Sequence, residues 1–115
     1  MKTTIVKIIS LISLLSIFAF GGDTVKEAEF KVFGNCSECK TRIEKSMKIS
    51  EVKLAKWDKK SKMLKVAYRA DVITLDSLQQ RIASVGHDTD KFTAADSVYD
   101  NLPGCCLYRD GNNTH

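Results

Sequence analysis

The chain has 115 residues, a formal net charge of +4 and four cysteines. This length allows one small domain, and an apolar fraction of 43% is typical of a folded protein and too high for a disordered one. Acidic residues interleave with the basic ones, so no one-signed block marks a nucleic-acid-binding surface, and we expect no nucleic-acid partner. The cysteines fall into two pairs, Cys36 with Cys39 and Cys105 with Cys106.

Residues 1–21 have the pattern of a secretory signal peptide. Two lysines near the start precede an apolar run over residues 8–20, and Ala19-Phe20-Gly21 is a small-x-small cleavage site. As a helix, the apolar run is shorter than the hydrocarbon core of a bilayer, which is about 30 Å thick. We therefore expect cleavage near Gly21, export to the periplasm and no stable membrane insertion of the mature chain. In that compartment disulfides persist.

Residues 22–95 are expected to form one domain in which strand and helix periodicities alternate. The expected elements are a strand at 28–32, a helix from near Ser37, strands at 52–57 and 64–69, a helix capped by Thr74 and ended by Gly86, and a short strand at 89–93. Apolar and charged residues alternate in the clearest strands, and apolar residues recur three or four apart in the helices. This order predicts an α+β, ferredoxin-like βαββαβ sandwich, with two helices on one face of a four-stranded antiparallel sheet. Trp57 and Tyr68 are expected in its core.

Cys36 and Cys39 form a C-x-x-C motif between the first expected strand and the first expected helix. At a helix start both sulfurs can converge, and the positive end of the helix dipole favours their thiolate form. Two thiolates with few other ligands nearby suit soft ions such as Cu(I) or Hg(II), whereas Zn(II) usually takes four ligands and fits less well. The same motif also occurs in thiol–disulfide oxidoreductases and as a structural disulfide, so these alternatives stay open.

The run FGNCSECKTRIE, from Phe33 to Glu44, resembles the metal loop of heavy-metal-associated domains. This family includes periplasmic mercury-binding proteins, copper chaperones and the N-terminal modules of metal-transporting ATPases. The resemblance covers about residues 26–95 and implies that Cys36 and Cys39 are metal ligands. It also implies that the partner is a metal-transporting membrane protein or another metal-binding domain. The methionine that packs under the loop in the family is missing here, and Phe33 is the candidate to replace it.

Gly86-His87-Asp88 falls where the same family carries a Gly-aromatic-acidic turn beside the metal loop. We expect His87 to be a surface histidine of this turn; an indirect influence on the metal is the second interpretation and direct ligation the third. Three basic side chains of the first expected helix, Lys40, Arg42 and Lys45, are either a solvated helix face or a surface that steers an acidic partner.

The C-terminal tail, residues 96–115, carries Cys105 and Cys106 in the segment YDNLPGCCLY. It resembles tails that follow such domains in some bacterial heavy-metal proteins, and its apolar content predicts that it docks on the domain. An extended path of about ten residues reaches ~35 Å, which exceeds the ~25 Å breadth of a domain of this size. We therefore hypothesise that the two cysteine pairs share a three- or four-thiolate site or pass a metal between them. The alternative is a disulfide, either within a pair or between the pairs.

Together these features predict an exported, monomeric protein that sequesters or transfers Cu(I) or Hg(II) by thiolate exchange. The alternatives are a thiol–disulfide oxidoreductase and a binding module with structural disulfides. No Trp or Pro flanks the C-x-x-C motif, and the single proline of the chain is Pro103. The missing flanking residues argue against a thiol–disulfide oxidoreductase. The sequence contains no Ser–His–carboxylate set and no phosphate-binding loop, so we expect no enzymatic activity.

Overall fold

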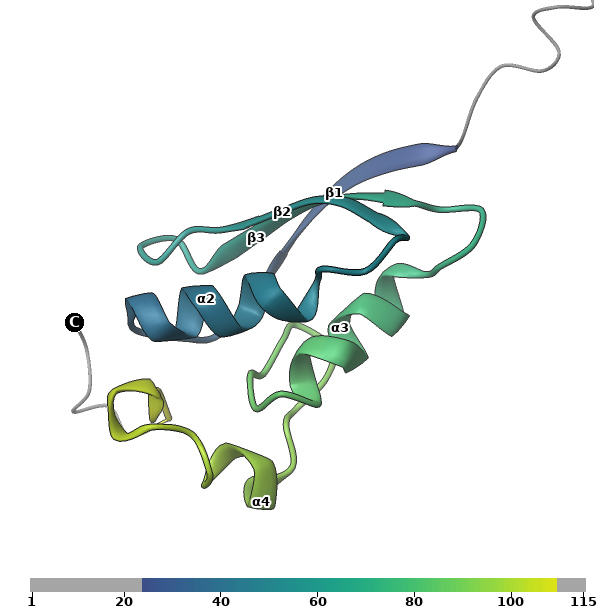
Figure 1. The fold of residues 1–115 in the computed structure, drawn as a ribbon. Helices are drawn as coiled ribbons and strands as arrows, with labels where there is room; N and C mark the ends of the chain where they lie inside the picture. Colours follow the sequence, from purple (N-terminus) through teal and green to yellow (C-terminus); the bar gives the residue numbers. More distant parts are fainter. Residues whose placement is uncertain (1–23, 110–115) are drawn as a thin grey trace, which may run out of the picture.

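The computed structural model describes residues 24–109, and the expected signal peptide and the last six residues lie outside this range. The elements in chain order are β1 (Val25–Lys31), α2 (Ser37–Ser46), β2 (Val52–Trp57), β3 (Met63–Arg69), α3 (Leu75–Ala83), α4 (Asp96–Tyr99) and the 3-10 helix η1 (Gly104–Cys106). Figure 1 shows α2 and α3 below one face of the sheet, with the C-terminal segment lying beneath the start of α2. None of the helices in the described range is long and apolar enough to cross a membrane.

The three strands form one antiparallel sheet in the order β1-β3-β2. Phe30 of β1 and Trp57 of β2 both pair with Leu64 of the central strand β3. Because side chains alternate between the two faces of a strand, Leu64 and Val66 point to the same side, where both are fully buried. The ferredoxin-like arrangement predicted from the periodicities is confirmed.

Trp57 and Tyr68 lie in the core, as the sequence predicted, and are 1% and 8% exposed. The indole Nε1–H of Trp57 donates hydrogen bonds to the carbonyl oxygens of Val32 (3.0 Å) and Lys62 (3.2 Å). These bonds satisfy the buried indole N–H, and they fix the chain where β1 leads into the C-x-x-C loop. Trp57 therefore supports both the core and the loop.

The expected fourth strand is not confirmed in the described part of the chain. Only an isolated antiparallel bridge joins Val32 to Thr89. The backbone N–H of Thr89 then donates to the carbonyl oxygen of Phe92 (2.8 Å), and the Asp90 carboxylate accepts from the N–H of Lys31 (2.9 Å). These local bonds turn the chain away from the sheet edge and take partners that a strand would need.

The C-terminal segment packs into the same core as the sheet and the helices. Gly86 ends the α3 region with a φ of 107°, and an added Cβ there would lie 2.8 Å from the Leu102 side chain. Tyr99, Leu102 and Cys106 are all buried in the core cluster. The predicted docking of the tail is confirmed, while a domain boundary after residue 95 stays a prediction.

Candidate metal centre

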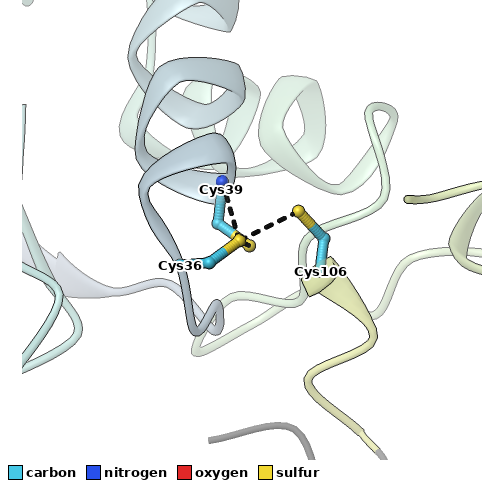
Figure 2. Close-up of side chains that lie close together, drawn as sticks. All are labelled: Cys36, Cys39 and Cys106. Carbon is cyan, nitrogen blue, oxygen red and sulfur yellow. Dashed lines mark hydrogen bonds between the residues drawn. The ribbon is translucent and has the colours of Figure 1, made fainter. Parts of the chain in front are cut away.

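Three cysteine sulfurs converge at the N-terminal end of α2. The Sγ of Cys36 lies 3.2 Å from the Sγ of Cys39 and 3.2 Å from the Sγ of Cys106. Figure 2 shows these three side chains turned toward one another, two from the start of the helix and one from the C-terminal segment. Cys39 and Cys106 are fully buried and Cys36 is 7% exposed. All four cysteines are free thiols, and such a cluster of sulfurs suits a soft metal ion.

The start of α2 sets the positions of Cys36 and Cys39. Cys36 is the N-cap residue, and its sulfur accepts a hydrogen bond from the backbone N–H of Cys39 (3.4 Å). Asn35 holds the second sulfur: its backbone N–H donates to the Cys39 Sγ (3.5 Å), and the Cys39 thiol donates to its Oδ1 (3.3 Å). Each of the two sulfurs thus accepts one backbone N–H bond at the start of the helix.

The tail brings its two cysteines to different places. Cys106 enters the buried cluster, whereas Cys105 is partly exposed and its thiol donates to the Glu38 carboxylate (3.3 Å). The Cys105 sulfur lies 3.7 Å from the sulfurs of both Cys36 and Cys106. A shallow, open hollow beside the cluster is lined by Cys36, Ser37, Glu38, Lys59 and Cys105. Cys36 is therefore the member of the buried cluster that borders solvent.

Arg42 lies against the sulfur cluster. Its Nη1 donates to the Cys106 Sγ at 3.3 Å and lies 3.4 Å from the Nε2 of His87. Although burial opposes the charge, the hydrogen bond to Cys106 raises the pKa of Arg42, so the guanidinium stays protonated. The positive charge therefore lies where negative charge on sulfur would collect.

The cysteine pKa values differ because their surroundings differ. Burial opposes ionisation of Cys36, but hydrogen bonds from the Cys106 thiol and the Cys39 N–H lower its pKa below the ordinary value. Burial raises the pKa of the Cys39 thiol to about 12, although the Asn35 N–H acts in the opposite direction. The hydrogen bond to the Glu38 carboxylate raises the pKa of Cys105 to about 12. Cys36 is thus favoured as the first thiolate over Cys39 and Cys105.

The expectation that His87 is a surface residue is wrong. His87 is fully buried, its Nδ1 lies 2.8 Å from the Phe33 carbonyl oxygen, and its ring stacks on Tyr108 at 5.4 Å and 18°. Burial lowers the pKa of His87 to about 4, so the ring is neutral at pH 7. An Nδ1–H donated to the carbonyl leaves Nε2 as an acceptor facing Arg42. His87 thus contacts Arg42, which in turn contacts the Cys106 sulfur, and an indirect influence of His87 on a metal stays a prediction.

Two other expectations about side chains near the loop are corrected. Phe33 does not replace the missing methionine under the loop, because it is 37% exposed and its ring lies beneath the Lys31 ammonium (5.0 Å). Trp57 lies close under the loop instead: a Cβ added to Gly34 would lie 3.1 Å from its ring. Arg42 is not part of a free steering surface, since it faces Cys106 and His87.

Lys40 is also engaged, because its ammonium group bonds the Glu44 carboxylate (2.6 Å) and the Trp57 carbonyl oxygen (2.7 Å). Lys45, the third basic residue of this helix, is exposed.

Sequence reasoning missed the roles of Arg42 and Asn35. The helical periodicity contained a signal for Arg42, because residues three apart lie on one face of a helix and Arg42 follows Cys39 by three. Asn35 directly precedes the N-cap position, and its buried amide has no sequence signature of its own.

Comparisons with protein families and with curated proteins find no match. Among solved structures, the N-terminal domain of a potential copper-translocating P-type ATPase from Bacillus subtilis, in its Cu(I)-loaded state, is 26% identical, with a TM-score of 0.54 over 57% of this chain and 85% of that one. A putative copper-ion-binding protein from Bacillus anthracis is 24% identical, with a TM-score of 0.56 over 60% of this chain and all of that one. A CopZ metallochaperone is 21% identical, with a TM-score of 0.53 over 56% of this chain and 98% of that one.

These similarities confirm the resemblance to heavy-metal-associated domains and the ferredoxin-like fold. They span nearly the full length of two of the neighbours but little more than half of this chain.

Proposed function

We propose that this protein binds a soft metal ion, Cu(I) or Hg(II), through Cys36 and Cys39 and transfers it by thiolate exchange. The observation that carries the proposal is the convergence of the two sulfurs, 3.2 Å apart, at the first turn of α2. Neighbours of the same fold are named as a metallochaperone and as a copper-translocating ATPase domain, and this supports Cu(I) as the first ion to test. Zn(II) fits less well, because it usually takes four ligands.

Exchange would proceed through Cys36. Hydrogen bonds lower the pKa of its thiol despite burial, and it lines the hollow that opens to solvent. A thiolate of the acceptor enters on this side and binds the ion before the Cys36 sulfur leaves. Cys39 lies deeper and holds the ion until the last step. The ion passes between thiolates without being released to water, and its oxidation state does not change.

The partner and the location belong to the same proposal. A protein that gives up its ion by thiolate exchange needs an acceptor with exposed thiolates, either a metal-transporting membrane protein or another metal-binding domain. The signal-like residues 1–21 support export to the periplasm, and they lie outside the described residues. We propose that the protein works there as a monomer and without catalysis.

The test is a competition titration of the reduced full chain with Cu(I) and a chromophoric Cu(I) chelator. We expect one tightly bound Cu(I) per wild-type chain and loss of that binding in the Cys36→Ser/Cys39→Ser double variant. Ser37→Ala is the matched control, because it keeps both sulfurs at the same helix start. Absence of Cu(I) binding by the wild type, or equal binding by the double variant, would refute the proposal.

The same samples test the oxidoreductase alternative. Insulin reduction by the wild-type chain, absent in the double variant, would favour that alternative over metal transfer.

A further inference from the structure

We infer that the C-terminal tail supplies a third metal ligand, Cys106, so that the ion is held by three thiolates rather than two. This inference rests on the proposed soft-metal function and goes beyond it, because it assigns the tail to the site and sets the coordination number. Cys105, although adjacent in sequence, stays outside the ring of ligands.

The distances favour a three-sulfur ring. The ligand atoms of Cys36, Cys39 and Cys106 all lie within 4.8 Å of one another. With metal–sulfur bonds of about 2.3 Å, a trigonal ion needs sulfurs ~4.0 Å apart, whereas a linear two-coordinate ion needs them ~4.6 Å apart. The Cys36 and Cys39 sulfurs lie 3.2 Å apart, so closing a trigonal site takes less displacement than opening a linear one. The third sulfur lies at the same 3.2 Å from Cys36.

The Arg42 guanidinium also lowers the electrostatic cost of a third thiolate at Cys106. Three thiolates carry three negative charges, and a buried net charge is costly unless it is paired. The ion contributes one positive charge as Cu(I) or two as Hg(II). The Arg42 guanidinium, 3.3 Å from the Cys106 sulfur, contributes one more positive charge. The charges then sum to minus one with Cu(I) and to zero with Hg(II).

Cys105 is not one of the three cysteines whose sulfurs all lie within 4.8 Å of one another. Its partner is the Glu38 carboxylate, a negative group that opposes a thiolate at this position, and its sulfur lies 3.7 Å from those of Cys36 and Cys106. It is also partly exposed, whereas Cys106 is fully buried. The two adjacent cysteines therefore form a matched pair in which one is a ligand and the other is not.

X-ray absorption spectroscopy of the full chain loaded with one equivalent of Cu(I) tests the inference, with Hg(II) as a second probe. We expect three sulfur neighbours per ion in the wild type and in Cys105→Ser, and two in Cys106→Ser. In the chelator competition, Cys106→Ser should weaken Cu(I) binding by at least about tenfold, and Cys105→Ser by less than about twofold. Two sulfurs in the wild type, or a loss caused by Cys105→Ser instead, would overturn the inference.

The outcomes also separate the two proposals. A wild-type chain that binds one ion through two sulfurs, and loses it in the Cys36→Ser/Cys39→Ser variant, refutes the third ligand but keeps the proposed function. A wild-type chain that binds no soft ion refutes both.

Loss of the Cys106 side chain could also detach the tail, which the backbone NMR signals of Tyr108 would reveal. Arg42→Gln keeps all four thiols and is the second variant for that case. We expect it to lower the number of sulfur neighbours toward two, and an unchanged count of three in both variants would refute the inference.

Discussion

Arg109 binds the Asp88 carboxylate through two hydrogen bonds, from Nε to Oδ2 at 3.0 Å and from Nη2 to Oδ1 at 2.7 Å. The same guanidinium donates to the Ala94 carbonyl oxygen (2.8 Å) and lies 4.2 Å from the centre of the Tyr99 ring. Such a two-pronged pair fixes orientation as well as distance. It joins the end of the described tail to the turn that carries His87, and it holds the segment that delivers Cys106 to the sulfur cluster.

Replacing Arg109 by Ala should therefore weaken both the fold and the metal site. Hydrogen bonds to charged groups contribute about 1.5–3 kcal/mol each, so we expect a fall of about that size in the free energy of unfolding, measured in urea. Cu(I) affinity should fall as well, because the docked tail becomes less populated. Lys91→Ala is the matched control: its ion pair with Asp76 is also 3.0 Å long but exposed, and such pairs contribute about 0–1 kcal/mol. Equal effects of the two substitutions would show that the Arg109–Asp88 pair does not hold the tail in place.

Two glycines provide a matched test of the metal loop. A Cβ added to Gly34 would lie 3.0 Å from the Cys39 Cβ and 3.1 Å from the Trp57 ring, whereas one added to Gly104 would meet no atom within 4 Å. We expect Gly34→Ala to displace Cys39 and to lower Cu(I) affinity by about tenfold, equivalent to about 1.4 kcal/mol. Gly104→Ala should leave affinity within about twofold of the wild type. The chelator competition measures both, and loss of affinity in Gly104→Ala alone would contradict the packing described for the loop.

Metal binding should also slow hydrogen exchange in the tail. If Cys106 is a ligand, the ion ties η1 to α2, and local opening of the tail then requires the metal–sulfur bond to break. We expect slower exchange at the N–H groups of Cys106 and Tyr108, which bond the carbonyl oxygens of Pro103 and Cys106 at 2.8 Å. NMR-detected exchange with and without one equivalent of Cu(I) measures this change. Equal protection by Cu(I) in wild type and Cys106→Ser would show that a bond from the metal to Cys106 is not the cause of the protection.

The sequence predicted the parts of the fold that depend on local pattern. Alternation in the strands and the Thr74 cap predicted the order of the elements, and the side-chain oxygen of Thr74 accepts from the Ser77 N–H (3.1 Å) as expected of a cap. The prediction of a fourth strand is not confirmed, because side-chain and turn hydrogen bonds around Thr89 and Asp90 compete with the backbone bonds of a sheet. The periodicity of the sequence carries no information about such competition.

The site was predictable as a meeting of two cysteine pairs, but not in its detail. The choice between Cys105 and Cys106 depends on the direction in which the short turn at residues 104–106 projects each side chain. The burial of His87 depends on Tyr108, a residue 21 positions later whose hydroxyl donates to the Gly86 carbonyl oxygen (2.7 Å). Both features arise from tertiary packing of the tail, which a pattern within one segment cannot reveal.

Burial of neutral His87 makes stability depend on pH in a defined window. Its pKa falls from the ordinary 6.5 to about 4 on folding, chiefly because burial disfavours the charged ring. Between these pH values the unfolded chain binds more protons than the folded one, so stability is fully present above pH 6.5 and falls as the pH drops toward 4. The shift corresponds to a loss of about 3 kcal/mol across the window. The lowered pKa values of Asp88 and Glu44, whose ordinary values are 3.8 and 4.5, affect stability mainly below this window.

Urea unfolding of the reduced, metal-free chain at pH 7, 5.5 and 4.5 measures this dependence. His87→Gln removes the titrating ring while keeping a polar side chain, so the variant should be less stable at pH 7 but should lose little further stability on acidification. In the wild type, most of the expected loss of about 3 kcal/mol should have occurred by pH 4.5. A wild-type stability that is flat from pH 7 to 4.5, or a variant with the same slope, would show that His87 is not held neutral by its burial against Tyr108.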